Sequence, residues 1–469
     1  MSSPSNSYTI QAAIAAHRFG LGEASLEVVT GAPADWLSAQ IGPADAPRGD
    51  GLLTTAQALA NVAADRERRR EAKNPSAGMT AEQVLAGPYR EVALADLRSR
   101  LLTAAQTQRP FAERLQWFWA NHFTVSLAKG SARGLVGAFE RDAIRPNIAG
   151  SFETLLLAST THPAMLRYLD NTQSAGPHSQ IVGRAAYRAA KAGEAPRVTG
   201  LNENLAREVL ELHTLGAESA RSGIYTQADV TSFARVLTGW RVALQDDGND
   251  GLKTFHPAWH EPGAKTVLGK SYGAGPEALR AVLHDLARHP QTARFIATKL
   301  ARHFVSDEPP PALVDRLSTT YLEHDTQLAP LYQALIRSPE AWAPKPAKLK
   351  TPEEFVVSSA RLLRLDKRLF DRGDGAGTLA LGQRIQAAPS PAGWSDRAED
   401  WLGPDAVWKR VEWSTRTASR LGNSIDARAL ASQSLGPTLS RTTATQLARA
   451  ADGSQALALL LMSPEFQRR

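Results

Sequence analysis

The chain has 469 residues, of which 43% are hydrophobic and 22% are charged, a balance typical of folded proteins rather than disordered or fibrous ones. Its 54 Lys and Arg residues against 47 Asp and Glu residues give a formal charge of only +7, spread along the sequence, which argues against nucleic-acid binding. The sequence contains no cysteine, so disulfides, thiolate nucleophiles and cysteine-bound metals are excluded.

A chain of this length exceeds the usual size of one hydrophobic core, so we expect two or three packed lobes. We divide it into an N-terminal helical lobe over 1–240, a long loop or hairpin over 241–275 and a C-terminal helical lobe over 276–469. No signal peptide is visible, and the apolar run Ala456–Met462 is far shorter than the roughly 20 residues of a membrane span. The sequence therefore predicts a cytoplasmic chain without a transmembrane segment.

Helical periodicity runs through most of the sequence. Apolar residues recur at spacings of three and four, as in segment 93–102. Helix starts are indicated by Thr226, which Asp229 follows three residues later, and by the segment Thr351–Glu354. These features predict an all-α fold class, a multi-helix array or bundle with long loops and one candidate short β-hairpin.

An aromatic helix is predicted to run through the segment WFWANHF, residues 117–123. On this helix Trp119 lies one turn from His122 and Trp117 lies one turn from Asn121, so aromatic side chains cover several faces and burial is expected nearly all round. A buried amide and imidazole need hydrogen-bond partners, because an unmet polar group costs about 1–3 kcal/mol. Two interpretations stay open, a structural polar pair or the wall of a pocket.

A second polar helix is predicted over residues 201–216. Glu208 and Glu211 share one face of it, whereas His213 lies on a different face, which argues against a compact metal site on this helix alone. The carboxylates either join a site that other helices complete or belong to an amphipathic helix in which Arg207 pairs with a neighbouring glutamate.

Three segments rich in Gly, Pro, Ser or Asp interrupt the helical pattern, 170–200, 244–275 and 372–393. The second contains the candidate hairpin strands, Thr254–His260 and Thr266–Leu268. It also contains His256 and His260, whose spacing of four suits metal ligation on a helix, although Pro257 argues against a continuous helix there. The two histidines are therefore a loop-borne candidate for metal ligands.

Lys299 and His303 are also four residues apart, beside aromatic residues. We interpret them as a basic strip on the surface rather than an anion site. The sequence has no phosphate loop, no dinucleotide-binding glycine pattern and no nucleophile elbow, so the kinase, Rossmann and serine hydrolase classes lack support.

Seven segments carry a family resemblance, namely HRFGLG at 17–22, WFWANHFTVS at 117–126, HPAMLRYLDN at 162–171, GLNENLAREVLELHTLG at 200–216, YTQADVTSFARVLTGW at 225–240, KLARHFVSDEPPP at 299–311 and LKTPEEFVVS at 349–358. Together they resemble the bacterial domain of unknown function 1800 family over nearly the whole chain. The resemblance implies a predominantly helical fold.

The same resemblance implies a partner. Genes for family members often lie beside genes for a second family, domain of unknown function 1501, which resembles the alkaline-phosphatase superfamily and often carries a twin-arginine export signal. Export of this chain attached to such a partner is the expectation that follows. The family offers no agreed catalytic residues, so the candidate residues rest on side-chain chemistry.

Our leading functional hypothesis is an oxidoreductase with a buried pocket lined by Trp117, Trp119, Asn121, His122, Glu208, Glu211 and His213. A buried indole beside an imidazole suits redox chemistry or modification to a quinone, so the expected cofactor is a modified tryptophan or a metal ion at Trp119 and His122. His122 would carry the proton, and Glu208 or Glu211 would act as base or metal ligand. This hypothesis requires the aromatic and acid-bearing segments to meet around an enclosed void.

Two alternatives belong to other classes. The first is a non-catalytic helical scaffold that binds a partner protein through its long loops. The second is metal-assisted hydrolysis that uses His256, His260 and acidic residues.

Overall fold

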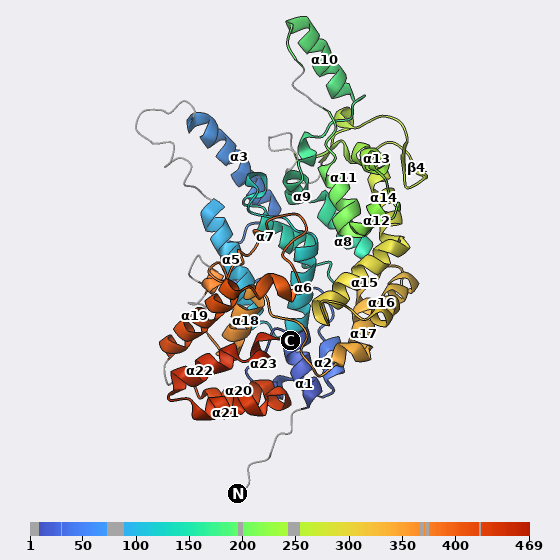
Figure 1. Ribbon diagram of the computed structural model, residues 1–469. Coiled ribbons are helices and arrows are strands. Elements are labelled where there is room, and N and C mark those ends of the chain that lie inside the picture. Colours follow the sequence, from blue (N-terminus) through green and yellow to red (C-terminus); the bar gives the residue numbers. More distant parts are fainter. Residues whose placement is uncertain are drawn as a thin grey trace.

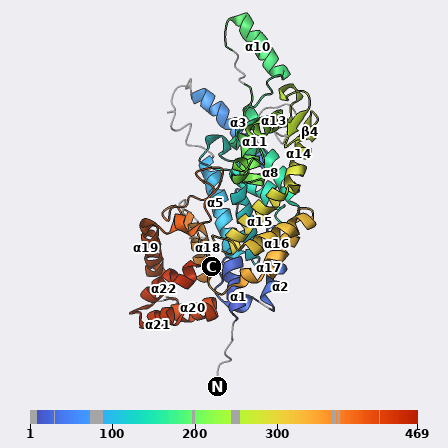
Figure 2. The same ribbon diagram turned by 45° about the vertical axis from the view of Figure 1, so that its right-hand side comes forward.

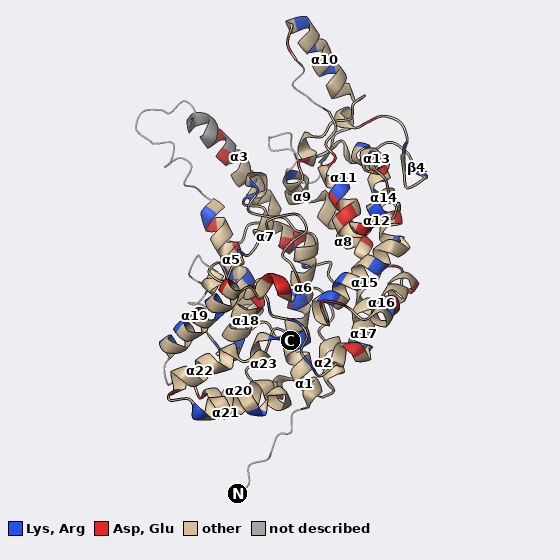
Figure 3. Cartoon of the chain, in the orientation of Figure 1, with Lys and Arg blue, Asp and Glu red and all other residues tan. Residues whose placement is uncertain are grey.

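A computed structural model describes residues 9–29, 31–72, 89–195, 200–242, 254–365, 370, 375–421 and 424–469. Helices dominate this part of the chain, which confirms the predicted all-α class (Figure 1). Basic and acidic residues are interspersed over these helices (Figure 3). Among the same residues, no helix combines the length and the apolar character that crossing a bilayer requires.

The described helices fall into two runs along the chain, 10–237 and 257–467, and η marks a 3₁₀- or π-helix. The first run is α1 (Ile10–Ile14), η1 (Ala15–Phe19), η2 (Leu26–Val28), α2 (Pro33–Ser38), α3 (Thr55–Ala72), α5 (Tyr89–Gln106), α6 (Pro110–His122), η3 (Gly130–Ala132), α7 (Val136–Phe139), η4 (Glu140–Ile144), α8 (Phe152–Thr161), α9 (Pro163–Tyr168), η5 (Asn171–Gln173), α10 (Gln180–Ala192), α11 (Asn204–Glu208), η6 (Val209–Thr214), α12 (Glu218–Arg221) and α13 (Gln227–Leu237). The second run is η7 (Pro257–Trp259), α14 (Pro276–Arg288), α15 (Pro290–Phe304), α16 (Pro311–Glu323), α17 (Leu328–Arg337), η8 (Pro339–Trp342), α18 (Pro352–Leu362), η10 (Gly375–Gly377), η11 (Ala398–Trp401), α19 (Pro404–Leu421), α20 (Ala427–Leu435), η13 (Gly436–Thr438), α21 (Arg441–Arg449), α22 (Gly453–Met462) and α23 (Pro464–Gln467).

Local sequence signals explain several of the helix starts. Thr226 accepts a hydrogen bond from the backbone N–H of Asp229, whose carboxylate accepts one back, which closes a capping box at the start of α13. Thr351 and Glu354 form the same reciprocal pair at α18, and Pro352 occupies the first helical position, where no intrahelical N–H is lost. Both predicted starts are confirmed.

The buried side chains form two hydrophobic clusters. The larger one draws on α1, η1, α6, α8, α9, α11, η6 and the helices from α13 to α17, whereas the smaller one joins α5 to α18, α19, α20 and α22. In both views α19 to α22 lie on one side of the molecule and α14 to α17 on the other (Figures 1 and 2). The predicted division at 241–275 stays a prediction. The larger cluster has no buried member after Ala341, whereas the smaller cluster combines residues from Phe355 onwards with Leu21, Leu101, Ala104 and Trp117.

The described strands pair differently from the predicted hairpin. β2 (Thr254–Phe255) pairs with β1 (Trp240–Arg241), while β3 (Lys265–Val267) pairs with β4 (Lys270–Tyr272). The predicted pairing of 254–260 with 266–268 is therefore wrong. The reason is the tight turn after β3, in which Leu268 and Gly269 both adopt positive φ angles, of 50° and 75°, and reverse the chain at once.

The predicted loop over 170–200 is wrong in its middle, where α10 projects from the body of the molecule (Figure 1). The alanine-rich segment has high helix propensity, and Gly193 ends the helix with a left-handed φ of 66°. In contrast, the described part of 372–393 holds only the short helix η10 and turns, as the loop prediction states.

Candidate functional site

Helix α6 is the centre of the candidate site. Every residue of α6 except Ala120 and Asn121 is buried, which confirms the expected burial nearly all round. Its aromatic side chains connect the two hydrophobic clusters, because Trp117 belongs to the smaller cluster while Phe118 and Trp119 belong to the larger one.

The indole N–H of Trp119 has a hydrogen-bond partner inside the protein. Its indole N–H donates to the hydroxyl oxygen of Tyr332 at 2.6 Å, and that hydroxyl donates to the backbone carbonyl of Ile148 at 2.6 Å. The rings of Phe123 and Phe152 pack with centroids 6.0 and 5.7 Å from the indole. This arrangement gives Trp119 the hydrogen bond that a buried indole needs without any ligand.

The aromatic and acid-bearing segments meet at His122. The Nε2 atom of His122 lies 3.1 Å from the backbone carbonyl oxygen of His213. Burial, and to a smaller extent the positive charges of Lys299 and His213, lower the pKa of His122 well below its usual value. The ring is therefore neutral and donates a hydrogen bond from Nε2. The rings of Phe123 and Phe152 lie 4.5 and 6.2 Å from this imidazole, so aromatic side chains pack around His122, and the void that the hypothesis requires stays a prediction.

Residues 201–216 contain two helices, because α11 ends at Glu208 and the π-helix η6 follows. A π-turn redirects the side chains that follow it, so the predicted α-helical faces do not continue through His213. Burial is the main cause that raises the pKa of Glu208, and the like charge of Glu211 adds to it. Burial and, to a smaller extent, the charge of Glu208 raise the pKa of Tyr168 to about 12. Glu208 is thus coupled electrostatically both to Glu211 and to Tyr168.

The structural interpretation of this helix also finds support. Arg207 pairs with Glu203 at 3.3 Å, as predicted for an amphipathic helix. His213 is buried, and burial, followed by Lys299, lowers its pKa to about 3. Neither ring nitrogen of His213 has a hydrogen-bond partner among the described residues.

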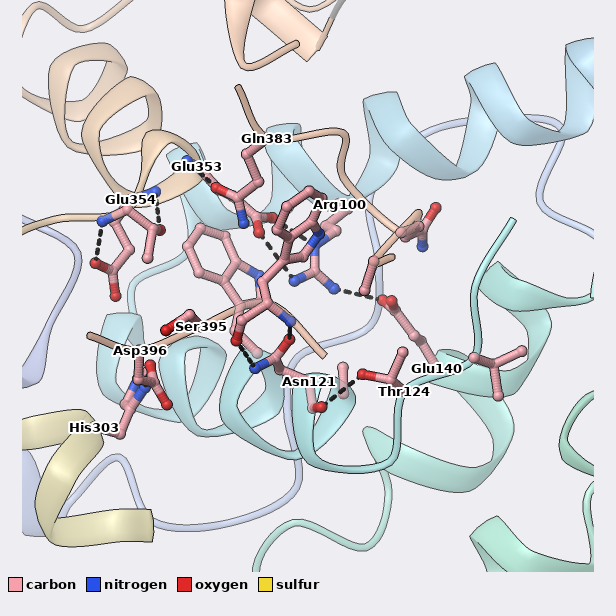
Figure 4. A pocket seen from close by; sticks show the side chains of 17 residues that line it. Arg100, Asn121, Thr124, Glu140, His303, Glu353, Glu354, Gln383, Ser395 and Asp396 are labelled. Atoms are coloured by element: carbon pink, nitrogen blue, oxygen red, sulfur yellow. Dashed lines mark hydrogen bonds and ion pairs between the residues drawn. The ribbon is translucent and has the colours of Figure 1, made fainter. Parts of the chain in front are cut away.

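A polar cavity lies on another face of α6, towards α5 and α18, and we call it the α6–α18 cavity (Figure 4). Its volume is about 70 Å³. The polar side chains in its wall are Arg100 of α5, Trp117 and Asn121 of α6, Thr124 just after α6, Glu140 of η4, His303 of α15, Thr351, Glu353 and Glu354 at the start of α18, and Gln383, Gln386, Trp394, Ser395 and Asp396 of the loops that follow. The structure therefore brings Trp117 and Asn121 to a cavity, whereas Trp119, His122, Glu208, Glu211 and His213 do not line it.

Arg100 holds two carboxylates in this cavity. Its guanidinium donates to Glu353 at 2.5 Å and to Glu140 at 2.8 Å (Figure 4). It also lies over the indole of Trp117, 5.3 Å from the ring centroid. One cation cannot neutralise two carboxylates, so burial and the like charge of Glu140 raise the pKa of Glu353 against the lowering effect of Arg100.

Asn121 anchors the loop that closes the cavity. Its side-chain amide donates to the carbonyl of Trp394 and accepts from the N–H of the same residue, both at 2.8 Å. The preceding residue, Gly393, has a φ of 84°, and a Cβ there would come within 2.6 Å of the Asn121 carbonyl oxygen. The amide is therefore a structural partner of the loop, and glycine is the residue that this close approach requires.

His303 and Asp396 form a buried pair in the same wall. The Nδ1 atom of His303 lies 2.8 Å from a carboxylate oxygen of Asp396, and His303 is 7% exposed. The predicted surface strip is thus wrong at His303, because α15 packs this side chain against Phe118 of α6. Burial lowers the pKa of His303 although Asp396 raises it, and His303 and Lys348 lower the pKa of Asp396 against its burial.

Three buried nitrogen atoms in the wall lack a hydrogen-bond partner among the described residues. They are Nε1 of Trp117, Nε1 of Trp394 and Nε2 of His303. Buried polar groups in folded proteins are nearly always hydrogen-bonded, so several unmet groups around one cavity indicate that a ligand or ordered water completes them.

The loop-borne metal candidate has a different environment. The Nδ1 atom of His260 lies 2.7 Å from the Thr238 carbonyl, and its Nε2 atom accepts from Lys265 and from the N–H of Gly275, both at 3.0 Å. Both ring nitrogens are therefore engaged within the protein. No group of three or more His, Asp or Glu side chains suited to a metal occurs among the residues described. The proposal of His256 and His260 as ligands stays a prediction.

Sequence reasoning missed most of the charged residues of the cavity. The sequence pattern marks Glu353 and Glu354 only as helix-start residues, and it predicts His303 only as a surface residue. One available signal was the position of the two glutamates directly before the apolar run Phe355–Val357, a pattern that indicates burial on every face. Arg100 and Asp396 have no comparable local signal.

The family model for "Protein of unknown function (DUF1800)" matches residues 14–468. Comparisons with curated proteins and with solved structures gave no match. The matched range covers the aromatic helix, the π-helices and every residue in the wall of the α6–α18 cavity. The chain belongs to the DUF1800 family.

Proposed function

We propose that the chain is an enzyme that binds a small polar molecule in the α6–α18 cavity and transfers a proton within it. The observation that carries this proposal is the state of His303. Its Nδ1 faces Asp396, which only accepts when ionised, so the ring proton resides on Nδ1 and Nε2 keeps its lone pair. A general base requires a neutral, oriented imidazole whose Nε2 lone pair is free to accept a proton, and His303 meets this requirement.

Glu353 supplies the complementary acid. Burial and the like charges of Glu140 and Glu354 raise its pKa against the lowering effect of Arg100, so this group retains a proton to higher pH than a solvated glutamate. Titratable groups with pKa values moved apart within one cavity are the usual basis for assigning an acid and a base. In this scheme the base is His303, which Asp396 orients, and the acid is Glu353.

The ligand must be small and must offer hydrogen-bond acceptors. A volume of about 70 Å³ holds on the order of two water molecules, at roughly 30 Å³ each, so it encloses one polar group of a ligand or a molecule of a few heavy atoms. The indole N–H groups of Trp117 and Trp394, which have no partner among the described residues, can only donate, so they select a ligand with hydrogen-bond acceptors.

Binding is tested by thermal unfolding of the wild type with a panel of small polyols, hydroxy acids and amino acids. We expect at least one compound to raise the melting temperature, and we expect Trp394→Phe, which keeps the ring but removes the N–H, to weaken its binding about tenfold. Trp408 is 61% exposed and lies outside the cavity, so Trp408→Phe is the matched control. The proposal fails if no compound stabilises the protein or if both variants bind equally well.

Proton transfer is tested by incubating the stabilising compound with the protein in D2O and following deuterium incorporation by NMR. We expect exchange to be lost in His303→Gln while binding persists. Exchange at the wild-type rate in that variant would refute the role of His303 as base.

We propose a redox form of the same site as the second candidate, located at Trp117. This indole lines the cavity with its N–H unmet, whereas Trp119 is hydrogen-bonded to Tyr332. The intact mass of the purified protein tests it, because a tryptophan-derived quinone adds oxygen to the chain and absorbs visible light. An unmodified mass without such absorbance would exclude this cofactor.

We further propose that a protein of the domain of unknown function 1501 family is the partner, and that export occurs attached to it. The support is family membership together with α10, which projects from the body and carries Tyr187 with 72% exposure (Figure 1). Co-expression followed by fractionation and pull-down tests both parts. Failure of the two proteins to copurify would exclude the partner.

A further inference from the structure

A second cavity lies where α1 meets the last residues of the chain, and we call it the Arg18 pocket. Its volume is about 180 Å³. Its apolar wall consists of Ile10, Ala13, Ile14, Pro344, Pro346 and Pro437. For scale, an engineered apolar cavity of about 150 Å³ binds benzene, so a compound of comparable size fits.

Arg18 also lines the pocket, where it is a buried cation beside the apolar side chains. It is 2% exposed, and its guanidinium donates to the backbone carbonyls of Ala341, Ala343 and Lys345 at 2.6, 2.7 and 3.2 Å. No carboxylate among the described residues pairs with it, and its Nε has no partner. Burying a charge is costly unless an opposite charge compensates it.

Two other charged groups in the wall add to the positive charge. Arg468 and Arg469 also line the pocket, and burial followed by Arg469 lowers the pKa of Arg18 to about 10. Arg469 shares its carboxylate partner, Glu354, with Arg114, so that single acid offsets two guanidinium groups. The one carboxylate of the wall, Glu465, accepts hydrogen bonds from Ser440 and Thr443.

We infer that the Arg18 pocket binds a small carboxylate with a short apolar tail. The tail would lie against the alanine, isoleucine and proline side chains, and the carboxylate would compensate the charge of Arg18. Carboxylate is the planar anion that a guanidinium recognises best, and desolvation by the apolar wall strengthens the attraction. This site uses none of the residues of the α6–α18 cavity, so the two proposals stand or fall separately.

Titration calorimetry of the wild-type chain with hexanoate, hexanamide and hexylamine tests the charge requirement. The three compounds have similar apolar tails and differ in the charge of the head group. We expect hexanoate to bind at least about tenfold more tightly than hexanamide, and hexylamine to bind least. Equal affinity for hexanoate and hexanamide, or no binding of hexanoate, would overturn the inference.

Ile10 offers a matched pair of variants that locate the binding site. It lines the pocket, is 41% exposed and begins α1, so both Glu and Lys are tolerated there. We expect Ile10→Glu to weaken hexanoate binding on the order of tenfold relative to Ile10→Lys, because the new charge faces the same pocket. Equal affinity in the two variants would place the ligand elsewhere and refute the assignment. Arg18→Gln should abolish the preference for hexanoate over hexanamide.

Discussion

Replacing Glu354 by Gln removes the carboxylate that two buried guanidinium groups share. Arg114 and Arg469 both donate to Glu354, the latter at 2.9 and 3.2 Å, and the side chains of all three residues are at most 4% exposed. Removing one partner of a buried ion pair costs about 3–5 kcal/mol, because the remaining charge stays buried without compensation.

Proton linkage gives a similar magnitude. Burial acts to raise the pKa of Glu354, but the charges of Arg114 and Arg469 outweigh this effect, and the pKa falls from 4.5 to about 2. That difference corresponds to about 3 kcal/mol of stability at neutral pH. Because the folded-state pKa lies below the unfolded-state value, the contribution is complete above pH 4.5 and is lost as the pH falls towards 2, leaving about half of it at pH 3.

Urea unfolding at pH 7 and pH 3 measures both effects. We expect Glu354→Gln to lower the free energy of unfolding by about 3 kcal/mol at pH 7 and by about half of that at pH 3. Glu340→Gln is the control, because the Glu340–Arg316 pair is partly exposed and such pairs contribute at most ~1 kcal/mol. A loss below ~1 kcal/mol at pH 7, or an equal loss at both pH values, would refute this reasoning.

Two further predictions concern the loop anchor and the aromatic core. Gly393→Ala should destabilise the fold by about 2 kcal/mol, since it forces a positive φ and a clash with Asn121, whereas Gly403→Ala has open space and should change stability by less than ~0.5 kcal/mol. Comparable unfolding midpoints for the two variants would contradict the close approach. The ring of His122 should show no NMR titration from pH 8 to 5, and because its folded-state pKa lies below 6.5 it should reduce stability as the pH falls below 6.5. A titration near 6.5 would mean that the ring is solvated.

The two cavities are connected through one ion cluster. Glu354 lines the α6–α18 cavity, Arg469 lines the Arg18 pocket, and the two side chains are paired. Substitutions at Glu354 therefore perturb both walls. For that reason the binding tests rest on Trp394 and Ile10, which lie outside the cluster.

Local signals determined the secondary structure. The capping boxes at Thr226 and Thr351 involve only a few neighbouring residues, and so does the apolar periodicity. Both can therefore be recognised in the sequence without tertiary context. The burial of α6 was readable for the same reason, because aromatic residues on several faces of one helix leave no solvated side. The π-turn in η6 was not readable, since such turns depend on packing rather than on propensity.

The sequence by itself thus determined an all-α chain with a buried aromatic helix, and it placed Trp117 and Asn121 among the candidate residues. Only the tertiary structure decided which polar groups share a cavity. Arg100 meets Glu353 across 253 positions of sequence, and His303 meets Asp396 across 93. Ion pairs of that separation form when packed helices exclude water around them, and no local pattern encodes which distant charge will be the partner.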